Sequence, residues 1–365
     1  MLDVVIIGFF SFTVLFYCGY SLFALVYGKN VKYKRGTDYT PEVTLVVPTR
    51  NEEKTIQQKI DNILETEYPK DMIEVIFVDS SNDGTKEIIN SFKKNSSMKV
   101  ALIEEKECRG LASALNIGYA AANGDIIIKS DCDMQLDKDF VKNIVTYFSD
   151  PQVGAVTGAI EVANKSDIEK GYRTLFHKLR LAEANFDSTY VFNAFAFRRT
   201  LLERINEKSV ADDAELALKI RKRGYKTLFA PDAIIYESSP LSIKDRIEQK
   251  SRRAQGHILL ACQNLSVLFN PKYGRFGIVI FPANFLMMLV LPWLMLSEIV
   301  LICIWLLTLL GYAALPVILV IILGISFVYL KSKPRLLAGF IDSQINLIVG
   351  TLQLIRKGPK FSWKD

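Results

Sequence analysis

The sequence predicts an α/β domain with a mainly parallel sheet, joined to transmembrane and interfacial helices. Short apolar runs alternate with helical segments between residues 42 and 240, and this alternation is typical of a parallel sheet. Long uncharged stretches lie near both ends of the chain, and about 20 apolar residues suffice to cross a bilayer. We therefore expect a polar globular domain held at a membrane.

The bulk composition supports this division. Half of the 365 residues are apolar and 23% are charged, with a mean hydropathy of +0.19. The net charge of +6 suits an anionic membrane face or a phosphate-bearing substrate, and without a basic-aromatic cluster we expect no nucleic-acid partner. The five cysteines form no CxxC pair, so neither a disulfide framework nor a zinc site is expected. No pattern in the sequence specifies an oligomeric state.

Residues 1–28 are expected to form an N-terminal transmembrane anchor. Positions 4–27 carry no charge, Asp3 precedes them, and the basic residues Lys29 and Lys32 follow. Under the positive-inside rule, this asymmetry places the N-terminus outside and the following domain in the cytosol. A cleaved signal peptide is the alternative, but it would begin with basic residues and end at a small-residue cleavage site.

Residues 276–330 are nearly all apolar and are long enough for two transmembrane helices. Gly311 and Tyr312 mark the expected turn between them, and Pro282 and Pro292 are expected to kink the first helix. The chain would thus cross the membrane more than once.

The C-terminal region also contains polar groups at membrane depth. Glu298 is the lone acid of its stretch, and facing lipid would cost it about 2.5–3.5 kcal/mol on insertion scales, so we expect it to face another helix or an interface. Residues 336–356 are apolar but include Asp342, Gln344 and Asn346. This segment is expected either to lie flat or re-enter the membrane, or to form a further transmembrane helix; the sequence leaves both open.

Residues 40–240 are expected to form the α/β domain. The predicted strands are Glu42–Pro48, Ile73–Asp79, Lys99–Ile103 and Asp125–Ser130, and the predicted helices are Glu53–Glu65, Gly84–Lys94 and Ala112–Ala122. Ligands bind such sheets beyond the carboxyl ends of the strands. Polar clusters follow three of these strands, at residues 49–52, 79–83 and 131–133. Their equivalent positions predict one site rather than three unrelated loops.

Two carboxylates, Asp131 and Asp133, come directly after the apolar run at residues 125–128. Carboxylates, phosphate oxygens and water are the ligands that Mg²⁺ or Mn²⁺ prefers. A DxD pair alone is common in solvated loops, but Asp79 at an earlier strand end favours a metal and phosphate site. Gln135 could help to hold the phosphate or the metal, or could be an ordinary loop amide.

Four segments, VVPTRNEEKTI, VDSSNDGT, RGLASALNIG and SDCDMQ, resemble the family 2 glycosyltransferases of the GT-A fold. These enzymes use nucleotide-sugar donors and invert the anomeric centre. The resemblance implies that Asp79 contacts the base or ribose, that Asp131 supports the nucleotide side, and that Asp133 ligates Mg²⁺ or Mn²⁺ on the diphosphate. It also places three residues against the nucleoside, namely Pro48, Arg50 and Glu52.

The segment ADDAELALKIRKRGYKTLFAPDAIIYE matches the acidic acceptor-side motif of the same family. Asp213 is the expected general base, which would remove a proton from the acceptor hydroxyl, and Asp212 is a possible acceptor or phosphate contact. Adjacent acids perturb each other's proton affinity, which suits a base. Acids at the start of a helix also complement its dipole, so a structural role is the alternative.

Residues 241–272 begin with LSIKDRIEQKSRRAQGH, an amphipathic pattern typical of an interfacial helix on the cytosolic side. The segment resembles the QxxRW motif of cellulose and hyaluronan synthases, with Gln249 and Arg252 matching and Arg253 in place of Trp. The resemblance implies a donor-side role for Gln249 and leaving-group stabilisation by Arg252. Arg253 could contact the acceptor or a phosphate, or the basic residues could contact lipid headgroups.

Two other features refine the family comparison. Arg198 and Arg199 resemble an arginine pair before the acidic motif and are possible phosphate contacts, with a surface role as the alternative. The segment RGLASALNIG and Gln135 are similar to dolichyl-phosphate mannose synthases, although these usually lack the later motifs. The architecture is therefore more similar to the cellulose and hyaluronan synthase group.

We therefore expect a multi-pass enzyme of the cell membrane with a cytosolic catalytic domain. It would transfer a sugar from a nucleotide-sugar donor to a lipid-linked or glycan hydroxyl, with membrane lipids as further partners. Processive polysaccharide synthesis is an alternative that the missing Trp disfavours. Transfer to polyprenyl phosphate is another, although such an acceptor offers Asp213 no hydroxyl proton. A catalytically silent nucleotide-binding scaffold and a nucleotide transporter are the alternatives from other classes.

Overall fold

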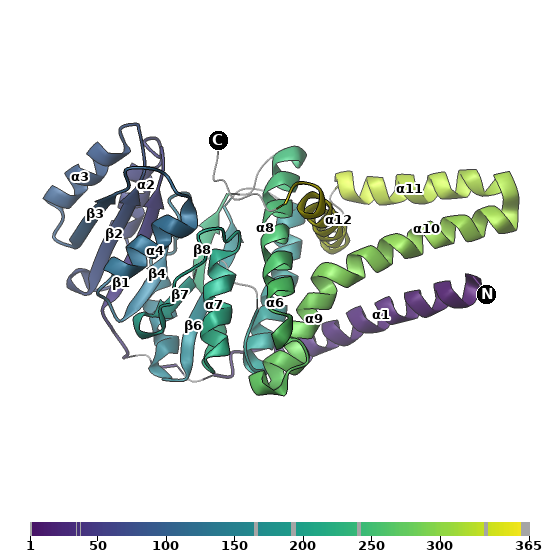
Figure 1. The fold of residues 1–365 in the computed structure, drawn as a ribbon, viewed down its shortest axis with the longest axis horizontal. Coiled ribbons are helices and arrows are strands. Elements are labelled where there is room, and N and C mark those ends of the chain that lie inside the picture. Colours follow the sequence, from purple (N-terminus) through teal and green to yellow (C-terminus); the bar gives the residue numbers. More distant parts are fainter. Residues whose placement is uncertain are drawn as a thin grey trace.

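The computed structural model describes residues 2–33, 35–36, 38–163, 167–190, 195–238, 242–331 and 335–358. In this part of the chain, an α/β domain lies at one end and long helices project from the other (Figure 1). Residues 239–241, where the predicted interfacial segment begins, lie outside the described residues.

The described residues form one eight-stranded sheet with the order β3-β2-β1-β4-β7-β6-β8-β5. Its strands are β1 (Val43–Thr49), β2 (Ile73–Asp79), β3 (Lys99–Glu104), β4 (Ile126–Lys129), β5 (Gln135–Leu136), β6 (Val153–Val162), β7 (Phe195–Arg198) and β8 (Lys226–Glu237). The four predicted strands are β1 to β4, which run parallel to one another. In contrast, β7 is antiparallel to both β4 and β6.

Helices cover both faces of the sheet. One core contains side chains of α2 (Ile56–Leu64), α3 (Thr85–Asn95), α5 (Phe140–Val145) and α6 (Asp167–Phe186). The core on the opposite face contains side chains of α4 (Leu111–Ala121) and α7 (Asp212–Lys222). Adjacent residues of one strand enter different cores, as with Leu45 and its neighbour Val46, because successive strand side chains point to opposite faces.

Three helical stretches of the described chain are long and apolar enough to cross a membrane: Asp3–Tyr27, Phe276–Leu330 and Leu336–Lys357. They contain α1 (Leu2–Tyr27), α9 (Phe281–Phe285), α10 (Leu291–Leu310), α11 (Ala314–Lys331) and α12 (Arg335–Lys357). The predicted turn between α10 and α11 occurs at Gly311, whose φ of 57° is a conformation that glycine adopts readily.

The expected proline kinks take the form of two π-helical turns. These turns, Phe276–Ile280 and Leu286–Val290, end two residues before Pro282 and Pro292. Proline lacks an N–H and crowds the preceding turn of a helix, and a widened turn relieves that conflict. Glu298 faces another helix, as expected: it is 6% exposed and accepts a hydrogen bond from Thr13 of α1 at 2.6 Å.

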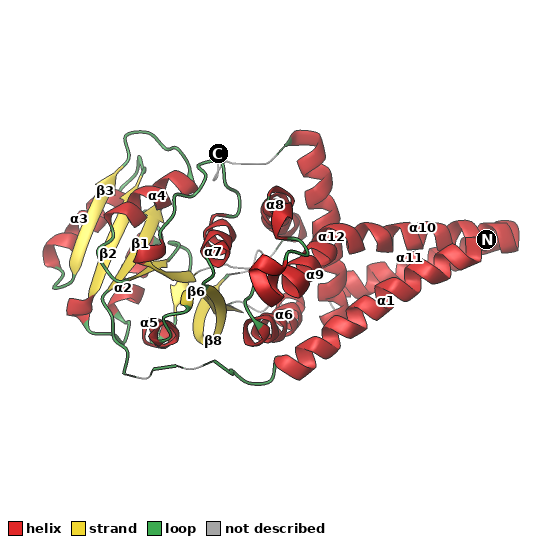
Figure 2. Ribbon diagram, turned by 60° about the horizontal axis from the view of Figure 1, so that its bottom comes forward, coloured by secondary structure: helices red, strands yellow, loops and turns green. Residues whose placement is uncertain are grey.

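The helix α12 runs across the ends of α1, α10 and α11 rather than alongside them (Figure 2). It packs on α8 (Ile243–Gln263) through Asp342, which is fully buried and lies 3.3 Å from Arg246 and 2.7 Å from Lys250. Arg246 of α8 is therefore buried, while Ile243 of the same helix is 44% exposed.

Candidate active site

The carboxyl ends of β2, β1 and β4 lie side by side, so the predicted polar clusters meet at one edge of the sheet. Asp79 ends β2 and is fully buried. Its carboxylate accepts hydrogen bonds from the Thr49 hydroxyl at 2.7 Å, the Ser81 hydroxyl at 2.6 Å and the Ser81 amide at 3.0 Å. These bonds fix the carboxylate in place without a ligand.

The loop after β1 is joined to the loop after β2. The Asn51 amide donates to the Ser81 hydroxyl at 2.7 Å, and the Glu52 amide donates to the Thr85 hydroxyl at 2.9 Å. Asn51 has a φ of 54°, a conformation that asparagine tolerates better than most residues. Pro48 is buried within β1, beyond the point where β4 ends its pairing with that strand, so a missing N–H is tolerated there. Arg50 is half-buried beside them.

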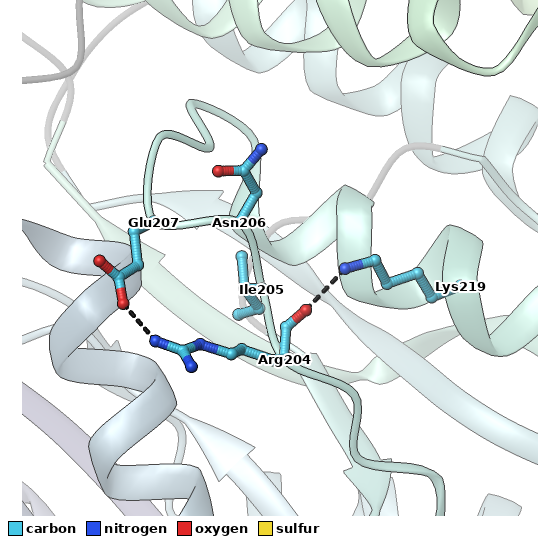
Figure 3. A pocket seen from close by; sticks show the side chains of 5 residues that line it. All are labelled: Arg204, Ile205, Asn206, Glu207 and Lys219. Carbon is cyan, nitrogen blue, oxygen red and sulfur yellow. Dashed lines mark hydrogen bonds and ion pairs between the residues drawn. The ribbon is translucent and has the colours of Figure 1, made fainter.

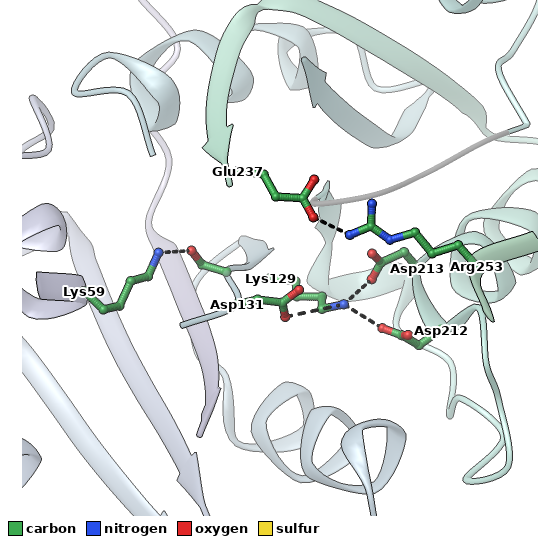
Figure 4. A network of polar contacts seen from close by, with 8 residues as sticks. Lys59, Lys129, Asp131, Asp212, Asp213, Glu237 and Arg253 are labelled. Atoms are coloured by element: carbon green, nitrogen blue, oxygen red, sulfur yellow. Dashed lines mark hydrogen bonds and ion pairs between the residues drawn. The ribbon is translucent and has the colours of Figure 1, made fainter. Parts of the chain in front are cut away.

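Lys129, the last residue of β4, lies among three carboxylates (Figure 4). Its side chain is 4% exposed, and Nζ lies 2.8 Å from Asp212, 2.9 Å from Asp213 and 3.6 Å from Asp131. Burial alone would lower the pKa of Lys129, but the three carboxylates outweigh it and raise that pKa well above its ordinary value. Lys129 therefore remains charged at neutral pH.

Asp212 and Asp213 begin α7, where the helix dipole favours negative charge. Burial and the adjacent Asp212 carboxylate raise the pKa of Asp213 well above its ordinary value. Burial also disfavours the charged form of Asp212, but Lys129 outweighs it and lowers the pKa of that carboxyl. The pair thus has one member that takes up a proton more readily than the other.

A second buried ammonium, that of Lys59 on α2, holds the loop after β4. Its Nζ donates to the Ser130 hydroxyl and to the Met134 carbonyl, each at 2.6 Å. Burial lowers the pKa of Lys59 to about 8. Asp133 lies between these two anchor points and is exposed. Desolvation and the carboxylates of Glu237 and Glu52 raise its pKa.

The loop fits a divalent cation that is shared with a ligand. Among the described residues, no group of three or more His, Cys, Asp or Glu side chains could hold a metal by itself. Mg²⁺ is commonly held by one or two carboxylates together with substrate phosphates and water. The exposed Asp133 carboxylate and Oδ1 of Asp131, which is buried without a hydrogen-bond partner in the described part of the chain, match that arrangement.

Glu237 links the end of β8 to α8. It is 5% exposed, accepts from Arg253 of α8, and lies 3.0 Å from Arg173 of α6. Burial opposes its ionisation, but the two arginines outweigh it and lower the pKa of Glu237 to about 2. Arg253 is thereby held where it also interacts electrostatically with Asp131 and Asp133.

Arg252 and Gln249 of α8 are half-buried, and in the described residues neither side chain has a hydrogen-bond partner or ion pair. Burial and the neighbouring Arg253 lower the pKa of Arg252, while Asp212, Asp131 and Asp133 oppose that shift. The Arg252 guanidinium therefore lies within electrostatic range of both acidic clusters.

The structure brings most of the predicted site residues together. β4 is two strands from β2, which corresponds to about 10 Å across the sheet. Asp79 and Asp131 therefore lie at opposite sides of one polar edge. Asp131 interacts electrostatically with Asp133 and with Asp213, so these two carboxylates lie near the same edge. Gln135 is half-buried in β5. It pairs with Tyr236, the residue that precedes Glu237 in β8.

Arg198 and Arg199 do not reach this edge. Because β7 is antiparallel to β4, Arg198 pairs with Ile126 at the amino end of β4, far from Asp131. Arg198 donates to the carbonyls of residues 153, 148 and 150, and Arg199 donates to the Gly124 carbonyl at 3.1 Å. The expected phosphate contact was wrong, since both side chains bind backbone carbonyls at the opposite end of the strand.

Three charged residues of the site were not predicted from the sequence. Lys129 lies inside an apolar strand, and a lysine there needs an anionic partner, which is the signal that could have found it. Lys59 shares the helical face of Ile56, Ile60 and Ile63, so its spacing predicts burial. Glu237 carries no comparable local signal, because its arginine partners come from other elements.

A shallow surface hollow of about 440 Å³ lies away from this cluster, beside the loop before α7 (Figure 3). Its lining includes Arg204, Glu207 and Lys219. Arg204 pairs with Glu207, and Lys219 donates to the Arg204 carbonyl at 2.6 Å. Because these charges already satisfy one another, we assign no ligand to the hollow.

Comparison with known proteins gives this geometry a context. Residues 44–206 match the family described as "Glycosyl transferase family 2", and residues 126–330 match the one described as "Glycosyl transferase family group 2". The second match spans more than half of the chain, from β4 to the end of α11.

Two curated relatives share part of their length with this chain. "Probable glycosyltransferase YdaM" of Bacillus subtilis (strain 168) is 30% identical over 275 residues, and the match covers 69% of this chain and 64% of that protein. "Poly-beta-1,6-N-acetyl-D-glucosamine synthase" of Staphylococcus aureus (strain COL) is 28% identical over 243 residues, and the match covers 63% of this chain and 58% of that protein. This chain thus spans less than two thirds of either relative.

One solved structure corresponds to nearly the whole chain. It is "Mannosyltransferase PcManGT from Pyrobaculum calidifontis in complex with GDP-Man and Mn2+". The two structures superimpose with a TM-score of 0.83 at 28% identity, covering 98% of this chain and 99% of the other. The similarity therefore includes α1 and the long helices α10 to α12 as well as the α/β domain.

Proposed function

The chain belongs to glycosyl transferase family 2, as its motifs predicted, and from that premise we propose that it transfers a sugar from a nucleotide-diphosphate donor to a hydroxyl of a lipid-linked or glycan acceptor. The predicted GT-A fold is confirmed by the superposition on a mannosyltransferase. That protein was solved with GDP-Man and Mn²⁺, which supports a nucleotide-sugar donor and a divalent cation for this chain.

The single observation that carries this proposal is the convergence of carboxylates around Lys129. Asp131 follows a strand, whereas Asp212 and Asp213 begin a helix some 80 positions later in the chain, and one ammonium contacts all three. A scaffold that only binds nucleotide has no need for buried acids on the acceptor side of its sheet. A base and a donor site held within one charged network suit group transfer.

Asp213 is the proposed general base. In an inverting transfer, the acceptor oxygen forms a bond to the anomeric carbon while the bond from that carbon to the diphosphate breaks. The hydroxyl proton passes to the Asp213 carboxylate, whose raised pKa makes it a better proton acceptor once it is ionised. Lys129 fixes the carboxylate at 2.9 Å and stays protonated throughout.

The nucleotide-sugar donor is proposed to bind along the carboxyl ends of β2, β1 and β4. Asp79 contacts the base or ribose and Asp131 supports the nucleotide side, together with a group of further contacts formed by Pro48, Arg50, Glu52 and Gln249. Asp133 holds Mg²⁺ or Mn²⁺ on the diphosphate, with Gln135 beside it. When bound, the cation neutralises charge that develops on the leaving diphosphate.

Basic residues of α8 complete the proposed site. Arg252 stabilises the leaving diphosphate, which is supported by its electrostatic contact with Asp131 and Asp133. Arg253 and Asp212 contact the acceptor or a phosphate. Because Arg253 replaces the Trp of the processive synthases, this position offers no aromatic ring on which a sugar could stack.

We propose a multi-pass location in the cell membrane, with the catalytic domain in the cytosol. Three stretches long enough to cross a bilayer and basic residues just after α1 support it. Processive polysaccharide synthesis remains a second candidate, since a relative bears the name of a poly-N-acetylglucosamine synthase. Polyprenyl phosphate is less suitable as an acceptor, because it offers no hydroxyl proton to Asp213.

The proposal is tested with membranes that contain the full chain. A panel of radiolabelled nucleotide sugars is supplied with Mg²⁺ or Mn²⁺, and the products are extracted and sized. We expect one donor to give a product that depends on the cation and is lost with a chelator. A lipid-soluble product with one added sugar identifies single transfer, and a long water-soluble chain identifies processive synthesis. No hydrolysis and no transfer from any donor would contradict the enzymatic proposal.

A further inference from the structure

A cavity of about 260 Å³ lies between the α/β domain and the helices α1 and α9 to α12, which we call the membrane-side helices. Its walls come from α1, α6, α8 and α12 and from the π-helical turn at Leu286–Val290. All three stretches that are long enough to cross a membrane therefore contribute to it. Ligand pockets usually measure roughly 300–1,000 Å³. The enclosed volume lies just below that range, which suits a headgroup and only the start of its chain.

One end of the cavity adjoins the candidate active site. Arg173 and Arg253 line it, and both also bind Glu237 at the end of β8. Arg253 interacts electrostatically with Asp131 and Asp133 as well. A guanidinium has five N–H donors, so Arg253 can bind Glu237 and an anion in the cavity together.

Apolar side chains from the stretches that are long enough to cross a membrane also line the cavity. Met287 and Met288 come from the π-helical turn, and Leu336, Phe340 and Leu347 come from α12. A ligand that suits both the charged and the apolar lining has a polar head directed at the candidate active site and a hydrocarbon part directed at the membrane.

The charge of the cavity favours an anionic head. Arg180 lines it in addition to these two arginines, and Lys250 lines it while paired with Asp342. Among the described residues of the lining the one carboxylate is that of Glu183, which already accepts hydrogen bonds from Tyr20, Asn284 and Thr189. Burial and the positive field of Arg180 lower the pKa values of two lining histidines, His177 and His257, to about 4. Such a field attracts a phosphate.

Polar atoms in the lining also lack partners. Nδ1 of His257 and Oδ1 of Asn346 are buried and have no hydrogen-bond partner in the described ranges of the chain. A buried polar atom without a partner costs about 1–3 kcal/mol, and a polar ligand removes that cost.

We propose that this cavity binds the phosphate-bearing headgroup of a lipid acceptor, with the phosphate near Arg180 and Arg253 and the hydrocarbon chain along the methionines and α12. This assignment rests on the proposed function and specifies where its lipid-linked acceptor binds. The cavity presents a headgroup sugar to Asp213 from the membrane side, while the donor occupies the strand ends.

Binding is measured on the purified full chain in uncharged detergent, with labelled 1-oleoyl lysophosphatidate as the probe. Monoolein lacks its phosphate and glycerol 3-phosphate lacks its chain, so we expect both to bind at least about tenfold more weakly, which corresponds to ~1.4 kcal/mol. Equal binding of monoolein would overturn the anionic-head assignment, and equal binding of glycerol 3-phosphate would overturn the lipid assignment.

Matched variants locate the probe. Arg180→Gln removes a lining cation, and Lys178→Gln removes an exposed one from the same helix. Ser343→Trp fills the cavity, and Leu352→Trp adds the same ring to an α12 position outside it. We expect the two lining changes to weaken binding at least about tenfold and the two controls to stay within about twofold. Arg180→Gln keeps the test decisive if Ser343→Trp fails to fold, and probe binding unchanged in the lining variants would overturn the proposal.

A transfer measurement separates an acceptor from a resident membrane lipid. In native membranes, we expect Ser343→Trp or Arg180→Gln to lower the ratio of lipid-soluble product to donor hydrolysis at least about tenfold. An unchanged ratio with lost probe binding means that the cavity holds a resident lipid, which overturns the acceptor assignment. Absence of hydrolysis and transfer in the unaltered protein would instead contradict the proposed function, and the probe measurements would still decide what the cavity binds.

Discussion

The two buried lysines of the candidate active site differ in the charge of their partners. Lys59 and Lys129 are 1% and 3% exposed, and they flank the same loop. Lys59 donates to a hydroxyl and a carbonyl, both neutral, and its pKa falls to about 8. Lys129 lies among three carboxylates, and its pKa rises well above the ordinary value.

The difference shows that the charge of the neighbouring groups, rather than the degree of burial, decides the direction in which the pKa of a buried lysine shifts. Lys59 positions the backbone and hydroxyl groups that flank Asp133, so we interpret it as an anchor of the loop. Lys129 supplies the positive charge that allows Asp131, Asp212 and Asp213 to lie close together. Replacing each lysine should therefore give different results.

Lys129→Met should have the largest effect. It leaves three carboxylates without their cation, and breaking a buried ion pair on one side costs about 3–5 kcal/mol. We expect a lower thermal midpoint and a loss of sugar transfer of at least about a hundredfold. Lys129→Arg, which retains the charge, should recover part of the stability. Stability equal to that of Lys59→Met would contradict the interpretation.

Lys59→Met should cost less, about 1–3 kcal/mol, because it leaves neutral groups without a donor. Its pH dependence is also distinctive. Between about pH 8 and 10.5 the unfolded lysine is protonated while the folded one is not, so the unfolded state binds more protons and stability rises with pH. The free energy of unfolding of the unaltered protein, relative to Lys59→Met, should increase across that window. A flat difference would show that Lys59 keeps its proton when folded.

The pH dependence of sugar transfer should shift by about one pH unit when Lys129 is replaced and should stay in place when Lys59 is replaced. Lys129 lowers the pKa of Asp213, so Lys129→Gln should raise that pKa further. Because Asp213 must be ionised to accept a proton, the acidic limb of kcat/KM should move to higher pH by about one unit, or ~1.4 kcal/mol. Lys59→Gln serves as the control and should leave the limb in place. Coincident limbs would remove Lys129 from the environment of the base.

Arg199→Gln should have the smallest effect. Its side chain binds the Gly124 carbonyl at the amino end of β4, away from the acidic cluster. We expect transfer rates and donor affinity within about twofold of the unaltered protein. A loss of donor affinity of tenfold or more would restore the phosphate contact predicted from the sequence.

The position of the candidate active site was largely predictable because strand ends in a parallel sheet meet at one side. Asp79, Asp131 and Asp133 follow recognisable apolar runs, and the first four strands lie where periodicity placed them. The direction of β7 has no local signal, so Arg198 and Arg199 were assigned to the wrong edge.

Contacts between distant elements were not predictable. Asp342 binds α8 through Arg246 and Lys250, and Glu237 binds arginines of α6 and α8. Each pair joins elements whose relative placement depends on the whole fold. The sequence indicated charged residues in apolar surroundings but did not specify their partners.

Turnover and donor affinity of Asp213→Asn test the proposed base most directly. We expect turnover to fall by about 10²–10⁴-fold, the usual contribution of a positioned base, while donor affinity is largely retained. Thermal unfolding of the variant establishes that it is folded. Turnover equal to that of the unaltered protein would show that another group accepts the proton and would contradict the account.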